Sequence, residues 1–127
     1  MPISKAEILM GRDKDYPLDV EQLQNLQKLL VAVNLFRQHY GKSMIVSSGY
    51  RPAAINAKTK GAAKKSNHMK VLACDFQDTD GAIDKFCIDN LHILEACGLW
   101  LESPDSTVGW SHLQCIPPKS GNRVFKP

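Results

Sequence analysis

The 127-residue sequence lacks the features that mark secreted and membrane proteins. No apolar run approaches the roughly 18 residues of a membrane span. Charged residues throughout the first thirty positions leave no apolar core for a signal peptide. The four cysteines include no Cys-x-x-Cys pair, so we predict that they are reduced and act as small apolar residues. We therefore expect a protein that is made in the cytoplasm without a signal peptide and has no membrane partner.

The sequence also lacks a strong charge of either sign. Its 16 Lys and Arg residues against 13 Asp and Glu residues give a formal net charge of +3, below the level of a dedicated nucleic-acid binder. The hydrophobic share of 43% is close to that of an ordinary globular domain, and the length suits one such domain. We predict a single domain over residues 1–127 that acts as a monomer and has no nucleic-acid partner.

Capping signals and apolar spacing predict three helices. Ser4 and Glu7 have the capping-box pattern that begins a short helix, which should end at Gly11. Apolar residues recur at helical spacing over residues 20–40 and predict a longer amphipathic helix. Asp80 is expected to cap a third helix, which should end at Gly98.

Short segments rich in β-forming residues predict strands at residues 44–48, 71–76, 99–102 and 109–115. Residues 51–70 contain five lysines and no sustained period, which predicts an exposed loop with a helical turn near residues 53–58. The tail, residues 116–127, is predicted to be irregular. The order of the elements favours an α+β fold, with a small antiparallel sheet and helices packed on one side, over a βαβ fold.

Two of the four histidines lie in positions that suggest chemistry. His68 ends the lysine-rich loop, and His112 lies within an apolar strand, whereas His39 and His92 are expected to be structural. Asp75 is the one charged residue in a buried strand. If the strands of Asp75 and His112 face one cleft, these three side chains form a ligand set that leaves zinc one open position. The alternative is that Asp75 is a buried, hydrogen-bonded carboxylate and His112 an ordinary strand histidine.

Four separated pieces of the chain carry a resemblance to a known family. They read SSGYRP at residues 47–52, SNH at 66–68, ACDF at 73–76 and WSH at 110–112. In this order they resemble the metallopeptidase family of zinc D-alanyl-D-alanine carboxypeptidases and bacteriophage L-alanyl-D-glutamate endopeptidases, which shares its fold with the hedgehog signalling domain. The resemblance implies that His68, Asp75 and His112 bind zinc and that Arg51 is both a catalytic and a substrate-binding residue. Ser66 is also expected among the substrate-binding residues, where its hydrogen bond would hold the loop or the histidine in place.

The sequence departs from the family pattern at two positions. Val71 stands where the family often has Gly, and Gly109 stands where many members have a catalytic Glu. A zinc peptidase needs a general base, so another carboxylate must take that role. We expect Glu102, at the end of the strand that should pair with the strand of His112, with Asp105 as the second choice. The alternative is that Glu102 is a solvated charge at a strand end.

The function implied by the resemblance is hydrolysis of peptide bonds in the stem peptides of bacterial peptidoglycan, either within the stem or at its terminal D-alanine. Zinc is the implied cofactor. The protein is expected to be a phage or prophage endolysin-type protein that acts on the cell wall or periplasm after release. Gly109 keeps a second possibility open, in which a non-catalytic zinc-containing domain binds cell wall or a protein partner. The loop lysines are compatible with attraction to an anionic wall, although a solvated loop is the preferred explanation.

Overall fold

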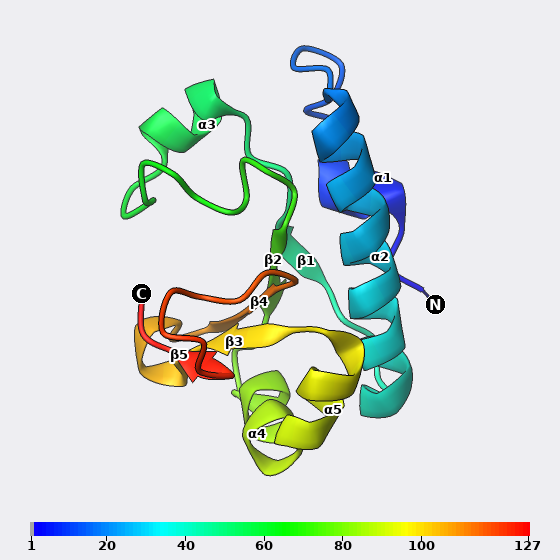
Figure 1. Ribbon diagram of the computed structural model, residues 1–127, viewed down its shortest axis with the longest axis vertical. Helices are drawn as coiled ribbons and strands as arrows, with labels where there is room; N and C mark the ends of the chain where they lie inside the picture. Colours follow the sequence, from blue (N-terminus) through cyan, green and yellow to red (C-terminus); the bar gives the residue numbers. More distant parts are fainter. Residues whose placement is uncertain (1) are drawn as a thin grey trace.

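A computed structural model describes residues 2–127, which form an α+β fold around a five-stranded sheet (Figure 1). The helices are α1 (Lys5–Leu9), α2 (Val20–Tyr40), α3 (Ala53–Lys58), α4 (Ala82–Asp89) and α5 (Leu91–Cys97), with a 3-10 helix, η1 (Pro104–Ser106). The strands are β1 (Val46–Ser48), β2 (Ala73–Gln77), β3 (Trp100–Glu102), β4 (Trp110–Gln114) and β5 (Val124–Phe125). The predicted fold class is confirmed.

The sheet has the order β1-β2-β4-β3-β5, and every neighbouring pair is antiparallel except β3 and β5. Asp75 on β2 lies directly opposite His112 on β4. Directly paired residues project to the same side of a sheet, so these two side chains share a face. β3 pairs with β4 as predicted, with Leu101 opposite Leu113. The pairing brings the end of β3, and with it Glu102, toward the strand of His112.

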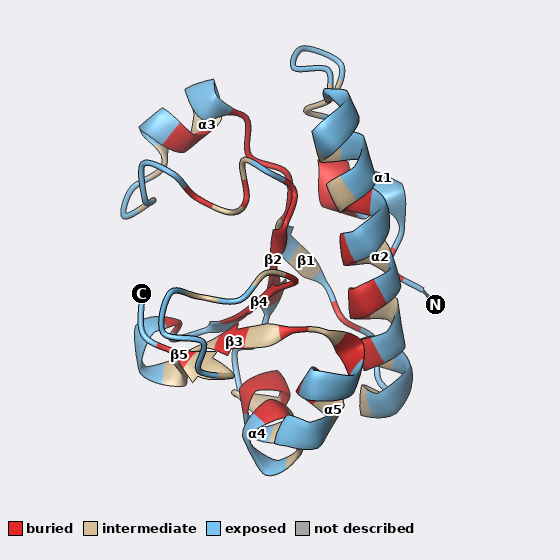
Figure 2. Ribbon diagram, in the orientation of Figure 1, coloured by how far each residue is buried: buried red, intermediate tan, exposed pale blue. Residues whose placement is uncertain are grey.

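The core lies between the other face of the sheet and the helices. Leu29, Val33 and Phe36 on α2 are fully buried, as are Phe76 on β2 and Leu113 on β4. Buried positions follow one side of α2 in Figure 2, which agrees with the predicted amphipathic helix. Because strand side chains alternate between faces, the residues on either side of Phe76 and Leu113 point away from the core.

The prediction of one continuous third helix is wrong. The segment forms α4 and α5, and the break is at Asn90, whose φ of −138° is not helical. The Asn90 side chain donates to the Phe86 carbonyl, which shows how asparagine competes with the helical backbone for hydrogen bonds. The N-cap of α4 is Gly81 rather than Asp80. The free N–H groups of its first turn are satisfied mainly by the Asp78 carboxylate.

The prediction that the whole tail is irregular is also wrong, because Val124 and Phe125 form β5 beside β3. The Leu101 N–H donates to the Arg123 carbonyl over 2.9 Å, and the Ser103 N–H donates to the Phe125 carbonyl over 2.6 Å. A two-residue strand is too short to show a period of two, so its sequence carried no usable signal. Its partner is the exposed edge of β3, which only the folded sheet provides.

The strand predicted to start at residue 71 begins at Ala73 instead. Val71 lies in the preceding turn and has a φ of 59°, in the left-handed region that glycine adopts most readily. This is the position where the related family often has Gly, so the valine preserves the backbone geometry that glycine favours. The Val71 side chain is fully buried, and this burial offsets a backbone cost of about 1–2 kcal/mol.

All four cysteines are free and buried, as predicted. Burial raises the pKa of each thiol, most strongly at Cys74 and Cys87, so they remain protonated apolar residues. Within residues 2–127, no helix combines the length and the apolar character needed to cross a membrane.

Candidate metal centre

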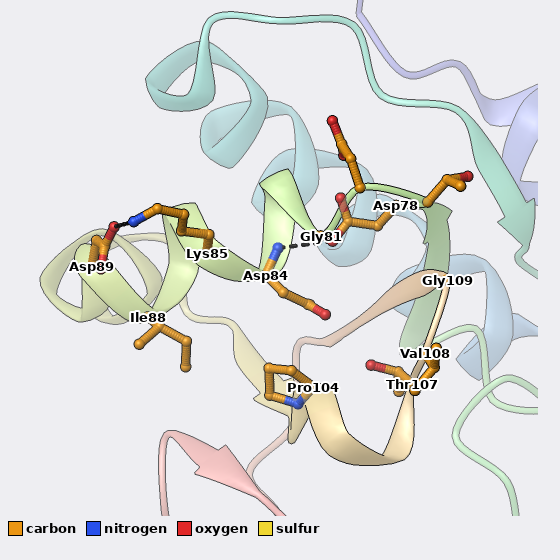
Figure 3. Close-up of a pocket in the computed structure, with 12 residues that line it drawn as sticks. Asp78, Gly81, Asp84, Lys85, Ile88, Asp89, Pro104, Thr107, Val108 and Gly109 are labelled. Atoms are coloured by element: carbon orange, nitrogen blue, oxygen red, sulfur yellow. Dashed lines mark hydrogen bonds and ion pairs between the residues drawn. The ribbon is translucent and has the colours of Figure 1, made fainter.

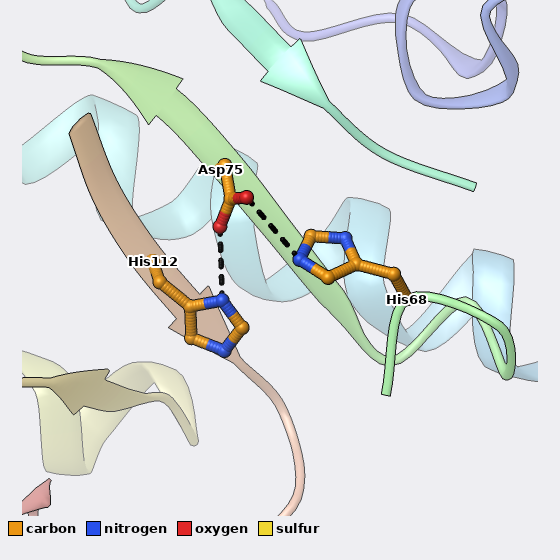
Figure 4. A group of neighbouring side chains, drawn as sticks. All are labelled: His68, Asp75 and His112. Carbon is orange, nitrogen blue, oxygen red and sulfur yellow. Dashed lines mark hydrogen bonds and ion pairs between the residues drawn. The ribbon is translucent and has the colours of Figure 1, made fainter. Parts of the chain in front are cut away.

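Three side chains predicted as metal ligands meet in one place. One ligand atom from each of His68, Asp75 and His112 lies within 4.8 Å of the others, and all three residues are at least nine-tenths buried. His68 Nε2 lies 3.3 Å from Asp75 Oδ2, and His112 Nδ1 lies 2.9 Å from Asp75 Oδ1. Figure 4 shows the two imidazole rings pointing at the carboxylate from different elements. In the described part of the chain, no other group of three His, Cys, Asp or Glu residues converges in this way.

The backbone around His68 is held by three hydrogen bonds. Its N–H donates to the Ser66 hydroxyl over 3.2 Å. Its carbonyl accepts from the Arg51 N–H over 3.1 Å and from the Val71 N–H over 3.3 Å. Ser66 therefore contacts the backbone of His68. The turn that contains Val71 places His68 next to the start of β2, within reach of Asp75.

Hydrogen bonds to other residues determine which ring nitrogen of each histidine carries the proton. His68 Nδ1 lies 3.0 Å from the Gly49 carbonyl, which only accepts, so this nitrogen is the donor. His112 Nε2 lies 2.9 Å from Gln114 Oε1. The Gln114 amide is oriented by donation from its Nε2 to the Ile116 carbonyl over 2.9 Å. When neutral, both rings therefore present an unprotonated nitrogen to Asp75.

This arrangement requires positive charge at its centre. Two nitrogen lone pairs and a carboxylate repel one another unless protons or a metal ion lie between them. Without metal, protons meet this need. Burial raises the Asp75 pKa, but the two histidines outweigh burial and hold the pKa well below its usual value. Burial likewise lowers the His112 pKa, and Asp75 outweighs it, so the net shift is upward. Two imidazoles and one carboxylate are also a ligand set that suits zinc and leaves it a free position.

Gly49 supports the site through its backbone, a role that sequence reasoning missed. A Cβ atom at this position would overlap the Ile8 carbonyl of the α1 helix. The next residue, Tyr50, donates its N–H to that same carbonyl over 2.7 Å. Only glycine allows this close approach, which holds the Gly49 carbonyl against His68. The glycine in the SGYR motif is therefore explained by close contact between two segments of backbone.

Arg51 lies in the same cleft, of about 520 Å³, as the three candidate ligands. Its guanidinium is largely buried and donates to the Asn56 side-chain oxygen over 3.2 Å and to the Ser48 hydroxyl over 3.1 Å. Within residues 2–127 it forms no salt bridge. Burial lowers its pKa, and the nearby Asp75 carboxylate opposes that shift. The guanidinium is thus positioned by neutral partners, and its charge is available to an anionic ligand.

Glu102 is half-buried at the end of β3 and lines this cleft. Burial raises its pKa, while the charge of His112 acts in the opposite direction. Asp105 lies exposed on η1 and does not line the cleft, and neither does Gly109. Among the described residues, Glu102 and Asp75 supply the side-chain carboxylates that line the cleft.

Two further residues complete the surroundings of His112. Gln114 is 3% exposed and accepts the His112 Nε2 hydrogen bond. Its position two residues after His112 on a strand was an available signal, because such residues share a face. Phe125 on β5 places its ring edge-on to the His112 ring, with centroids 6.2 Å apart. It could not be predicted, because β5 itself was not predicted.

Comparison with known proteins assigns the chain to a family. No curated protein and no solved structure matches the chain. A family model described as Peptidase M15 matches residues 3–92. The matched span contains Arg51, His68 and Asp75 and ends before Glu102 and His112. It covers well over half of the sequence and confirms the predicted resemblance: the chain belongs to the peptidase M15 family of zinc peptidases.

Proposed function

We propose that this chain is a zinc-dependent peptidase that hydrolyses peptide bonds in the stem peptides of bacterial peptidoglycan. The observation that carries the proposal is the convergence of His68, Asp75 and His112, with one ring nitrogen of each histidine directed at one buried carboxylate. Membership of a family that acts on peptidoglycan peptides supports the substrate class. The cleft also contains a guanidinium and a second carboxylate, which a peptidase can use for substrate binding and proton transfer.

In this proposal, His68 Nε2, an Asp75 carboxylate oxygen and His112 Nδ1 would hold zinc. When bound, zinc supplies the Lewis acidity that activates water and polarises the scissile carbonyl. Glu102 takes a proton from the attacking water and returns it to the leaving amine. Its raised pKa makes it a stronger base than an exposed glutamate.

Arg51 and Ser66 have supporting roles in the same proposal. Arg51 binds a carboxylate of the substrate or the negative charge that develops on the scissile carbonyl oxygen. Its hydrogen bonds to Asn56 and Ser48 keep the guanidinium in place for this contact. Ser66 holds the backbone of His68, so it acts on the metal ligand rather than on the substrate.

We further propose that residues 1–127 act as a monomeric single domain of the endolysin type, from a phage or prophage. It would be made in the cytoplasm and would reach the cell wall or periplasm after release. The formal charge of +3 is compatible with an anionic polymer as substrate. The products distinguish the two possible reactions: a carboxypeptidase releases free D-alanine, whereas an endopeptidase creates new amino termini within the stem.

A non-catalytic zinc domain that binds cell wall or a protein partner is the second candidate. The observation that favours it is Gly109, which stands where many family members have a catalytic Glu and has a left-handed φ of 95°. This candidate predicts zinc binding and peptidoglycan binding without hydrolysis. It also predicts that replacement of Glu102 changes neither property.

Incubation with purified peptidoglycan separates these two candidates. The zinc-loaded protein is expected to release D-alanine or create new amino termini. The chelator-treated protein and the Glu102→Gln variant should create neither, although the variant keeps its zinc. Asp105→Asn is the matched control and should retain activity, because Asp105 lies outside the cleft. Full activity in metal-free protein would overturn the zinc mechanism, and bound zinc without any product would favour the binding domain.

A further inference from the structure

The cleft around the candidate metal centre has two chemically different walls. One wall is formed by residues 59–63 and 65–67, which follow α3, and the other by Glu102, Trp110 and Phe125 from β3, β4 and β5. Figure 1 shows α3 and its following segment set apart from the β3 and β5 strands. A ligand that reaches His68 and His112 therefore contacts both walls.

The lysines of the loop are not equivalent with respect to this cleft. Lys60 and Lys65 line it, whereas Lys58, Lys64 and Lys70 do not. Both cleft lysines are solvent-exposed, and within residues 2–127 neither forms a salt bridge. Their ammonium groups are thus available to a ligand in the cleft. If the lysines served only solubility, there would be no reason for two of them to line the cleft while the other three do not.

The charges in the cleft favour an anionic ligand bound in one orientation. The Arg51 guanidinium, which has neutral partners only, adds a third cation to those of Lys60 and Lys65. The opposite wall carries the Glu102 carboxylate. A peptide with free carboxylates is attracted to the loop wall and repelled by Glu102. This orientation directs its backbone toward the metal ligands and the general base.

We propose that Lys60 and Lys65 form a carboxylate-binding subsite that makes the cleft selective for acidic peptides. This inference rests on the proposed peptidase function and names the chemical class of its substrate. Each ammonium group contacts a carboxylate of the bound peptide that takes no part in the reaction. The subsite lowers KM for acidic peptides and leaves zinc binding and the chemical step unchanged.

The test compares two double variants that remove the same charge. Lys60→Gln/Lys65→Gln changes the proposed subsite, and Lys58→Gln/Lys64→Gln is the matched control on the same segment. Each protein is assayed with a synthetic stem peptide that carries free side-chain carboxylates and with the same peptide in amidated form. The subsite variant should raise KM for the acidic peptide at least about tenfold, because charge-assisted hydrogen bonds are lost. Its kcat, its zinc content and its KM for the amidated peptide should stay unchanged.

Two results would overturn the subsite. One is an equal loss for the acidic and the amidated peptide, and the other is an equal loss in the Lys58/Lys64 control. Salt provides a further check, since added salt should weaken acidic-peptide binding in the control variant more than in the subsite variant.

A separate binding measurement distinguishes failure of the subsite from failure of the proposed function. Calorimetry with zinc-loaded Glu102→Gln protein measures peptide affinity without turnover. If the wild-type protein hydrolyses no peptide, the peptidase proposal fails, but a preference for acidic over amidated peptide that depends on Lys60 and Lys65 still supports the subsite. If hydrolysis occurs with no such preference, the subsite is wrong and the peptidase stands.

Discussion

Asp75 and Asp84 are both buried carboxylates, 9% and 7% exposed, but their surroundings differ. Asp75 faces two imidazoles in the cleft, and these outweigh burial and lower its pKa. Asp84 projects from α4 toward a pocket that Thr107 also lines (Figure 3). Its Oδ1 has no hydrogen-bond partner. Burial raises the Asp84 pKa to about 6, the Ser111 hydroxyl opposes this rise, and the nearby Asp78 carboxylate adds to it.

The contrast shows that burial alone does not make a metal centre. The hydroxyl of Thr107, which lines the same pocket, is also buried without a hydrogen-bond partner in the described structure. Hydroxyls are weak metal ligands compared with imidazoles, and no histidine lines this pocket. Ser111 and His112 are adjacent on β4, so strand alternation places one beside the α4 helix and the other in the cleft. Strand β4 therefore lies beside Asp75 on one face and beside Asp84 on the other. Asp75 has two imidazole partners, whereas Asp84 has none among the described residues.

The largest expected effect follows from exchanging each carboxylate for an amide. Asp75→Asn should lose stoichiometric zinc and reduce peptidoglycan hydrolysis to background, because the only anionic ligand of the candidate centre is removed. Asp84→Asn is the matched control and should keep both zinc and activity. Zinc analysis after gel filtration and a product assay measure these effects. Equal zinc retention in the two variants would contradict the proposed difference between Asp75 and Asp84.

Replacement of Glu102 should have the next largest effect. Glu102→Gln is expected to lower kcat by about 100- to 10,000-fold, the usual contribution of a general base, with zinc content unchanged. Steady-state kinetics on a synthetic stem peptide measure the loss. A kcat within threefold of wild type would show that Glu102 is not the general base, whatever the result for Asp75.

A smaller effect is expected from Gln114, which orients His112 without being a ligand. Gln114→Leu should weaken zinc binding by about 10- to 100-fold, since the ring loses the acceptor that keeps its proton on Nε2. Gln77→Leu, at the exposed end of β2, is the control. Competition with a calibrated chelator measures the affinity, and nitrogen NMR of the imidazole reports the tautomer. Unchanged affinity and tautomer in the Gln114 variant would contradict this role.

The smallest effect concerns stability at Asp84 and depends on pH. The pKa of Asp84 is about 6 in the folded protein and roughly 3.9 when unfolded, so between these values the folded state binds more protons. The carboxylate therefore costs stability progressively as pH rises from about 4 to 6. Asp84→Asn should raise the free energy of unfolding by up to about 3 kcal/mol at pH 7.5 and by little at pH 4. Urea unfolding at both pH values measures the difference, and an equal effect at the two would contradict the cause.

Strand alternation was sufficient to predict that Asp75 and His112 could share a cleft. Both residues lie in short apolar strands, where successive side chains point to opposite faces of the sheet. The structure places them opposite each other. The position of His68 depended on the family pattern, since a loop has no such period. The break at Asn90 was missed because the apolar spacing continues across it, while a side-chain hydrogen bond ends the first helix.

Other features depend on contacts between distant segments and had no local signal. The need for glycine at residue 49 arises from the carbonyl of Ile8, which lies far away in the sequence. The tautomer of His112 depends on how Gln114 is oriented by Ile116. Val71 illustrates the opposite case. The residue type departs from the family pattern, but the backbone of Val71, with a φ of 59°, has a conformation typical of glycine.

The central claim is that two histidines and one aspartate hold the metal, and zinc-edge X-ray absorption of the zinc-loaded protein tests it most directly. We predict a first shell of nitrogen and oxygen at about 2.0–2.1 Å with the scattering pattern of two imidazoles and no sulfur. The His112→Ala variant should lose one imidazole from that pattern. A shell containing sulfur at about 2.3 Å from one of the four cysteines, or an unchanged spectrum in His112→Ala, would contradict the account.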